Sequence, residues 1–267
     1  MEAPVYTQIE NLKVTVFQAY LFWENIDKNL LNLALRLSMG VREKTDIIIL
    51  PEMFNTGFSM NSEALAEEMG GKTMKWMQEK AYKFDAVVTG SIIIKENNQY
   101  YNRLIWMNPD GSYQKYDKKH LFTLAKEEKT YTAGKERPIF ELNGWKILPS
   151  ICYDLRFPVW LRNRKEEYDL LLNVANWPEK RAKHWQTLIP ARAIENQCFI
   201  IALNRVGHDG NEIYYSGDST CLDPNGRVVY YKRDEEDLYT FTIHKDDITK
   251  TRKEMPFLKD ADNFKII

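Results

Sequence analysis

Short, nearly continuous apolar runs recur along this chain, and they constrain its fold more than any other feature. They lie in residues 45–54, 86–94, 145–152, 168–175 and 198–207. A continuous apolar run of this length is typical of a strand that is covered on both faces. Residues 12–19, LKVTVFQA, are β-branched and alternating, and they predict a further strand.

Helical patterns lie between these runs. Apolar residues recur at helical spacing after Trp23, at Ile26, Leu30, Leu33 and Leu37. Similar patterns cover residues 73–84, 159–163 and 184–197, and Pro190 should start, kink or break the last of them. Strands that alternate with helices predict an α/β fold. Turn signals in residues 101–117 and 221–244 predict hairpins, which add antiparallel strands at the edges.

The 267 residues are predicted to form one domain, because no linker, repeat or low-complexity tract divides them. The net charge of −1 gives no reason to expect a nucleic-acid or membrane-surface partner. No apolar stretch approaches the roughly 20 residues of a membrane span, and residues 1–13 do not resemble a signal peptide. Three scattered cysteines are too few for a disulfide framework and favour the cytoplasm. Residues 257–267 are predicted as either a frayed tail or an arm packed on a partner.

Residues with complementary chemistry follow several predicted strands. Cys152 ends the run LPSIC, Glu52 follows IIILP, and Lys118 and Lys119 follow a strand-like stretch. Functional groups in open α/β sheets collect beyond the carboxyl ends of the strands. A thiol with an ordinary pKa of about 8.5 needs a base or a cation to become a nucleophile at neutral pH. A carboxylate in partly apolar surroundings can act as that base, and Glu52 is the candidate.

Considered separately, each of these residues is better explained by a structural role, and only their combination makes a functional role as good an explanation. A lone cysteine after an apolar run is more often a small core residue. A lone glutamate can cap a helix or form a salt bridge, and a Lys-Lys pair is usually solvated. The residues alone therefore leave both interpretations open.

Other patterns in the sequence do not predict function. The segment GGKT at residues 70–73 lacks the first glycine of a phosphate-binding loop, since Ala66 stands in its place. Ser216 and Ser219 in YSGDST are not in a Gly-x-Ser-x-Gly elbow. Histidines 120, 184, 208 and 244 are far apart and lack the spacing of metal ligands, so we expect no metal site.

Five segments resemble, in order, those of the nitrilase-type carbon–nitrogen hydrolase family. They are LPEMFNTGF, YDKKHLF, ICYDLRFP, ANWP with RAKHW, and ARAIENQCFIIALNRVG. The resemblance spans about residues 12–243, which we take as the core of a single domain of residues 1–267. It implies a four-layer αββα sandwich without a cofactor. It also implies a homodimer formed through helices near the nucleophile and through residues 244–267.

In that family a glutamate, a lysine and a cysteine form the catalytic set. The resemblance places them at Glu52, Lys118 and Cys152. Lys118 is preferred to its neighbour because it stands two residues before the histidine of HLF, and adjacent residues on a strand face opposite ways. A second glutamate, which holds the geometry of the site, corresponds to Glu127.

The resemblance further implies amide hydrolysis through a thioester. Glu52 would take the proton of Cys152, and the sulfur would attack the carbonyl carbon. The Lys118 ammonium and the backbone N–H of Tyr153 would stabilise the oxyanion. Glu52 would then protonate the leaving ammonia and later activate water.

CYDLRFP, WLRN and ANWP are most similar to the omega-amidase branch, whose members cleave the terminal amide of 2-oxoglutaramate or 2-oxosuccinamate. The carboxylate at the far end of such a substrate requires a cation or N–H donors. Arg181 is the candidate, whereas Arg156 is interpreted as a structural partner of Asp154 or another acid. The candidate pocket walls are Phe58, Phe122 and Trp177. Hydrolysis of an N-carbamoyl group or a nitrile, and a non-catalytic binding protein that keeps the fold, are the alternatives.

Overall fold

The computed structural model describes residues 11–265, and their strands form two sheets. The first sheet has six strands in the order β13-β1-β2-β3-β4-β5. Its strands are β1 (Asn11–Gln18), β2 (Ile47–Ile49), β3 (Val87–Glu96), β4 (Gln99–Met107), β5 (Tyr113–Asp117) and β13 (Asp237–His244). Within it, β1, β2 and β3 are parallel, and the other neighbours are antiparallel.

The second sheet has seven strands in the order β10-β11-β9-β8-β7-β6, with β12 paired to β11. Its strands are β6 (Phe140–Leu142), β7 (Trp145–Ile151), β8 (Leu170–Ala175), β9 (Phe199–Asn204), β10 (Val206–His208), β11 (Tyr214–Leu222) and β12 (Val228–Arg233). Here β7, β8 and β9 are the parallel strands. Each sheet thus combines a parallel centre with antiparallel edges, as the apolar runs and the hairpin signals predict.

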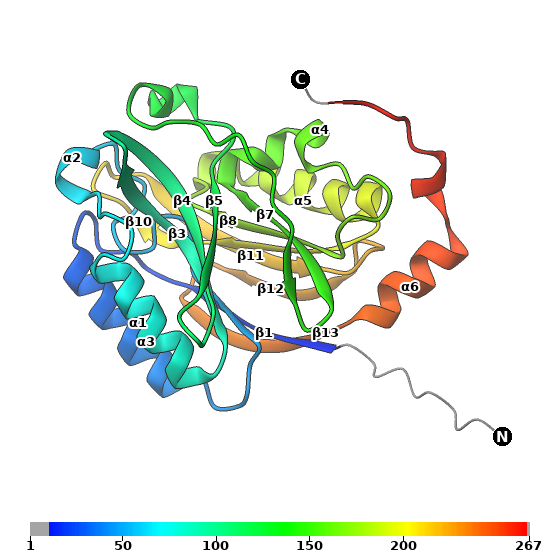
Figure 1. The fold of residues 1–267 in the computed structure, drawn as a ribbon, viewed down its shortest axis with the longest axis horizontal. Helices are drawn as coiled ribbons and strands as arrows, with labels where there is room; N and C mark the ends of the chain where they lie inside the picture. Colours follow the sequence, from blue (N-terminus) through cyan, green and yellow to red (C-terminus); the bar gives the residue numbers. More distant parts are fainter. Residues whose placement is uncertain (1–10, 266–267) are drawn as a thin grey trace.

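Six α-helices of residues 11–265 lie outside the two sheets. They are α1 (Ile26–Gly40), α2 (Ser62–Leu65), α3 (Lys72–Phe84), α4 (Pro158–Leu161), α5 (Ala182–Asn196) and α6 (Lys245–Glu254). In Figure 1, α1 and α3 lie together on one side of the strands, and α4 and α5 lie on the opposite side. The four-layer αββα sandwich is therefore confirmed.

The short strand β2 shows why its sequence is apolar throughout. Ile47 and Ile49 belong to the apolar cluster between the two sheets. Ile48 belongs to the cluster beneath α1 and α3. Because successive side chains of a strand point to opposite faces, a strand between two apolar layers has no face for polar residues.

Helix α1 contributes to the outer cluster through one stripe. Leu30, Leu33 and Leu37 are buried on it, and the Asn25 side chain caps its start by accepting the N–H of Lys28 at 3.0 Å. Burial of each such leucine contributes about 1.5–3 kcal/mol. The helical spacing seen in the sequence is thus the packing face of the helix.

The carboxyl ends of the central strands converge on one region. Glu52 follows β2, Cys152 follows β7, and Asn176 follows β8. The Asn176 N–H donates to the Glu52 carboxylate at 2.7 Å, which joins the two sheets at this point. Lys118 directly follows β5 and reaches the same carboxylate at 2.8 Å.

Several local expectations need correction or qualification. Helix α5 continues through Pro190, so the prediction that this residue starts or breaks the helix is wrong. In the closing segment β12 pairs with β11 as a hairpin, whereas β13 pairs with β1 of the other sheet. Leu258, near the C-terminus, is buried against its own chain. Residues 1–10, which include most of the segment judged for a signal peptide, and residues 266–267 lie outside the described part. No helix within residues 11–265 is long and apolar enough to cross a membrane.

Candidate active site

Glu52 is a fully buried carboxylate whose two oxygens both accept hydrogen bonds. Its Oε1 accepts from Lys118 Nζ and from Asn102 Nδ2, each at 2.8 Å. Its Oε2 accepts the backbone N–H of Asn176 at 2.7 Å. A buried carboxylate is tolerated only when it is paired and hydrogen-bonded, and these donors meet that condition.

Lys118 lies between two carboxylates. Its Nζ is 2.8 Å from Glu52 and 3.0 Å from Glu127. Burial alone would lower the pKa of Lys118, but the charges of Glu127 and Glu52 outweigh it and raise the pKa above its ordinary value. The group is therefore a permanent ammonium. Lys119 points elsewhere, with its Nζ 5.3 Å from the ring centre of Trp160.

Glu127 lies in a short 3-10 helix, η2 (Glu127–Lys129), and is fully buried. The backbone N–H of Phe122 donates to its Oε2 at 2.6 Å. Burial raises the pKa of Glu127, the charge of Glu52 raises it further, and the Lys118 charge opposes both. A turn of 3-10 helix thus brings a second carboxylate to the ammonium, as the resemblance implies.

Cys152 begins the 3-10 helix η3 (Cys152–Arg156), directly after β7, and its backbone is left-handed, with φ +45°. Its Sγ is 3.8 Å from the Asn176 carbonyl oxygen. Burial raises the pKa of the thiol well above its ordinary value, and the charge of Glu52 adds to this effect. Since the resting group is a thiol, a base must remove its proton before it can attack.

Asp154 holds the turn that carries this cysteine. Its Oδ2 accepts the Tyr116 hydroxyl at 2.7 Å and the Ile151 N–H at 3.0 Å. Its Oδ1 accepts the His120 N–H at 2.9 Å and lies 2.8 Å from His120 Nδ1. The carboxylate therefore links the cysteine turn to the segment that contains Lys118.

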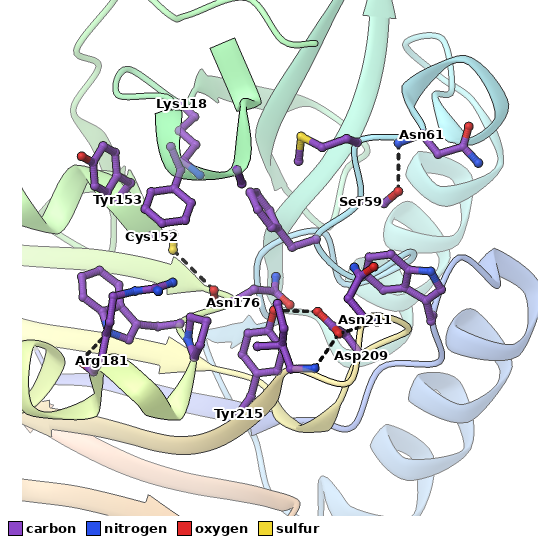
Figure 2. Close-up of a pocket in the computed structure, with 18 of the residues that line it drawn as sticks. Ser59, Asn61, Lys118, Cys152, Tyr153, Asn176, Arg181, Asp209, Asn211 and Tyr215 are labelled. Atoms are coloured by element: carbon purple, nitrogen blue, oxygen red, sulfur yellow. Dashed lines mark hydrogen bonds between the residues drawn. The ribbon is translucent and has the colours of Figure 1, made fainter. Parts of the chain in front are cut away.

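The cysteine opens into a cavity of about 400 Å³. All four residues predicted to bind substrate line it: Phe58, Phe122, Trp177 and Arg181. Figure 2 shows Cys152, Tyr153 and Arg181 toward one side of the cavity, and Ser59, Asn61, Asp209 and Asn211 toward the other. The cavity thus has a wall that carries the nucleophile and a cation, and an opposite wall that is polar.

The interpretation of Arg156 as a partner of Asp154 is wrong. Asp154 is occupied by the donors described above, and Arg156 instead lines the cavity. Its guanidinium lies 4.5 Å from the ring centre of Trp177 and donates to His184 Nδ1 at 3.1 Å. Within residues 11–265, neither Arg156 nor Arg181 forms an ion pair with a carboxylate. Burial lowers the pKa of Arg156, and the neighbouring charge of Arg181 lowers it further, so two uncompensated cations face one space.

Two asparagines belong to the site although the sequence analysis did not single them out. Asn176 donates to Glu52 and accepts from Cys152 through its backbone. Its position just after the run YDLLLNVA is the signal that could have identified it. Asn102 lies inside β4, where no strand end marks it, and its role depends on contacts that sequence does not show.

The other two cysteines and the serines of YSGDST do not line this cavity. Cys198 and Cys221 are fully buried, and burial raises the pKa of Cys198 to about 12. Ser216 and Ser219 are buried and bond to Asp218 and to the Asn204 backbone. In the described part of the chain, no three His, Cys, Asp or Glu side chains are grouped so that they could hold a metal ion.

Comparison with known proteins identifies relatives of this arrangement. The carbon–nitrogen hydrolase family model matches residues 13–253. "Omega-amidase YafV" of Yersinia enterocolitica is 46% identical over 222 residues, which are 82% of this chain and 84% of the relative. "2-Oxoglutaramate amidase" of Bacillus subtilis is 37% identical over 80% of this chain and 84% of its own. A Xanthomonas campestris CN-hydrolase superfamily crystal structure with an arsenic adduct in its active site superposes with a TM-score of 0.92. That chain is 41% identical, and the match covers 96% of this chain and 99% of the other.

Proposed function

The chain belongs to the carbon–nitrogen hydrolase family, and we propose that it is an omega-amidase. Its substrate is the terminal amide of a small dicarboxylic acid monoamide, such as 2-oxoglutaramate or 2-oxosuccinamate, and it releases ammonia. One observation carries this proposal: the cavity that holds Cys152 also holds the guanidinium groups of Arg156 and Arg181, which form no ion pair with a carboxylate of residues 11–265. A nucleophile for the amide and cations for a carboxylate are the two requirements of such a substrate.

The first half of the reaction acylates Cys152. Glu52 accepts the thiol proton as the sulfur attacks the amide carbon, and the carbonyl oxygen becomes an oxyanion. The Lys118 ammonium and the backbone N–H of Tyr153 stabilise that charge, and each such donor is worth about 10²–10³ in rate. Collapse of the intermediate breaks the C–N bond, and Glu52 returns the proton so that ammonia leaves and a thioester remains.

The second half releases the acid. Glu52, ionised again, takes a proton from water, and the resulting hydroxide attacks the thioester carbon. The C–S bond breaks, the thiol regains its proton, and the dicarboxylic acid leaves. Glu127 holds Lys118 in place throughout, through the contact at 3.0 Å. In this scheme Glu52 is ionised at the start of each half and becomes protonated once within it.

The far carboxylate of the substrate binds between Arg156 and Arg181. Arginine is suited to this role, because its planar group donates two parallel hydrogen bonds to a carboxylate and stays charged when partly buried. The Arg156 guanidinium lies 4.5 Å from the ring centre of Trp177, and the Arg181 guanidinium lies 5.0 Å from that of Phe122. These aromatic rings restrict the positions of the two guanidinium groups. Together with Phe58 they form the apolar walls along which the methylene groups of the substrate pack.

The remaining expectations are also proposals. We place the enzyme in the cytoplasm as one catalytic domain of residues 1–267. We further propose a homodimer, because Val159 of α4, which follows the cysteine turn, and Ile194 of α5 are 57% and 50% exposed. Light scattering of the purified protein tests the dimer directly.

Ammonia release from a panel of amides tests the proposed substrate. We expect the highest kcat/KM for 2-oxoglutaramate, lower values for succinamate and glutamine, and none for any compound with Cys152→Ala. A highest value for a nitrile or a carbamoyl amino acid would refute the omega-amidase assignment and leave the cysteine mechanism standing. Activity that survives in Cys152→Ala would refute both.

A further inference from the structure

Asn102 contacts both carboxylates of the catalytic cluster and the main chain of Lys118. It is fully buried in β4, and its Nδ2 is 2.8 Å from Glu52 Oε1 and 3.4 Å from Glu127 Oε1. Its backbone carbonyl accepts the N–H of Lys118 at 3.0 Å. We propose that the Asn102 side chain is a positioning residue that holds the two carboxylates together in their ionised forms, so that Glu52 is available as the base. The proposal rests on the role of Glu52 in the proposed function.

The balance of charge shows why such a group is needed. Two buried carboxylates face one ammonium, so the cluster carries a net negative charge whenever both carboxylates are ionised and Cys152 is a thiol. Two carboxylates that contact the same ammonium repel each other, which favours protonation of one of them. Within residues 11–265, Lys118 and Asn102 are the two residues whose side chains bond to both carboxylates. The amide therefore supplies the second set of donors that opposes protonation.

The identity of the residue fits this role. A primary amide carries two N–H bonds on one planar nitrogen and can reach two acceptors, whereas a hydroxyl donates one. An aspartate of the same shape would add a third negative charge. The Asn102 Oδ1 is buried and has no hydrogen-bond partner among residues 11–265, which is unfavourable unless the NH₂ contacts require this orientation.

The backbone and the side chain of Asn102 can be tested separately. The bond from Lys118 to the Asn102 carbonyl is made by the main chain and remains when the side chain is replaced. Asn102→Ala removes both donors to the carboxylates, and Asn102→Ser keeps a short hydroxyl. Asn173→Ala is the matched control, because Asn173 is also fully buried in a strand, has an unpartnered Oδ1, and donates to Ser150 at 2.9 Å outside the charged cluster.

The experiment measures two pH profiles, that of kcat/KM for 2-oxoglutaramate and that of Cys152 alkylation by iodoacetamide. Donors to an ionised carboxylate favour its ionised form, so their loss should move the acidic limb of both profiles to higher pH by about one unit in Asn102→Ala. We expect about a tenfold loss of kcat at the optimum, a smaller shift in Asn102→Ser, and an unmoved limb in Asn173→Ala.

An acidic limb that stays in place in both Asn102 variants would overturn the proposal, even if kcat falls. An equal shift in Asn173→Ala would also overturn it, because the effect would then be one of general packing. If Asn102→Ala does not fold, the limb of Asn102→Ser decides. Failure of the wild-type enzyme to hydrolyse 2-oxoglutaramate would refute the proposed substrate alone, since the alkylation profile needs no substrate.

Discussion

Replacing Arg181 by methionine tests how the cavity selects its substrate. The change keeps an apolar stem beside Phe122 and removes one of the two guanidinium groups that face the cavity. A hydrogen bond to a charged group contributes about 1.5–3 kcal/mol, and every 1.36 kcal/mol is tenfold. Because Arg156 remains nearby, we expect the lower end of this range, about a tenfold loss of kcat/KM for 2-oxoglutaramate.

The double variant Arg156→Met/Arg181→Met removes both cations and should lose about 10²–10³-fold, since Lys118, the other cation that lines the cavity within residues 11–265, is already paired with Glu52 and Glu127. The assay compares 2-oxoglutaramate with pentanamide, which has the same chain length and amide but no carboxylate. Pentanamide should change by about twofold or less, because the nucleophile and the oxyanion donors are untouched. The preference for the carboxylate substrate, taken as a ratio of kcat/KM values, should therefore collapse.

Lys180→Met is the control for long-range attraction of the anion. Lys180 precedes Arg181 in the chain, is exposed, and does not line the cavity. Its loss should change the ratio by less than about twofold, because exposed charges are screened by salt. If the arginine variants lose activity equally on both amides, so that the ratio of kcat/KM values is unchanged, carboxylate binding by these arginines is refuted.

Three further predictions concern the same region. Lys118→Met should lower the free energy of unfolding by about 3–5 kcal/mol at pH 8, because a buried ion pair loses one partner. The pKa of Glu127, already raised in the folded state, should rise further in this variant. The variant should therefore regain stability as the pH falls from 8 toward 5. A melting temperature lowered equally at pH 8 and pH 5 would contradict this. Iodoacetamide should add one label to the native protein, at Cys152, and none to Cys152→Ala in the same time, as measured by intact mass. Labelling of Cys198 or Cys221 at the same rate would contradict the assignment of Cys152 as the accessible nucleophile. Gly134→Ala would place a methyl group 2.1 Å from the Asp117 carbonyl oxygen and displace the chain beside Lys118. We therefore expect kcat to fall by about tenfold or more and the melting temperature to fall. Unchanged kinetics would contradict a displacement of Lys118.

The layers of the fold could be predicted because a strand buried on both faces has a continuously apolar sequence. In β2, Ile47 and Ile49 pack toward one layer and Ile48 toward the other, so the run is apolar without a break. The pairing of strands cannot be read from composition in this way. Nothing in the sequence of residues 237–244 shows that β13 pairs with β1 rather than with β12. Pro190 also misleads, because a helix packed along its length tolerates one missing donor.

For the site, chain position was informative only where a strand ends. Glu52, Lys118 and Cys152 follow strands and are marked in that way, and similarity to a family added Glu127. Arg156 was misread because Asp154, two residues earlier, is a natural partner in sequence but is already bonded to Tyr116 and His120 in space. Which partner a polar side chain finds depends on the tertiary fold, and local spacing does not determine it.

The left-handed backbone at Cys152 restricts which nucleophiles this position could ever use. Unbranched side chains tolerate φ +45° at moderate cost, whereas a β-branched residue there is a strong outlier. Threonine, which serves as a nucleophile in other hydrolases, is therefore excluded by the main chain before its chemistry matters. Serine would fit, but Glu52 would have to remove a proton from a much weaker acid. The turn thus excludes a β-branched nucleophile at residue 152, and the greater acidity of a thiol then favours cysteine over serine.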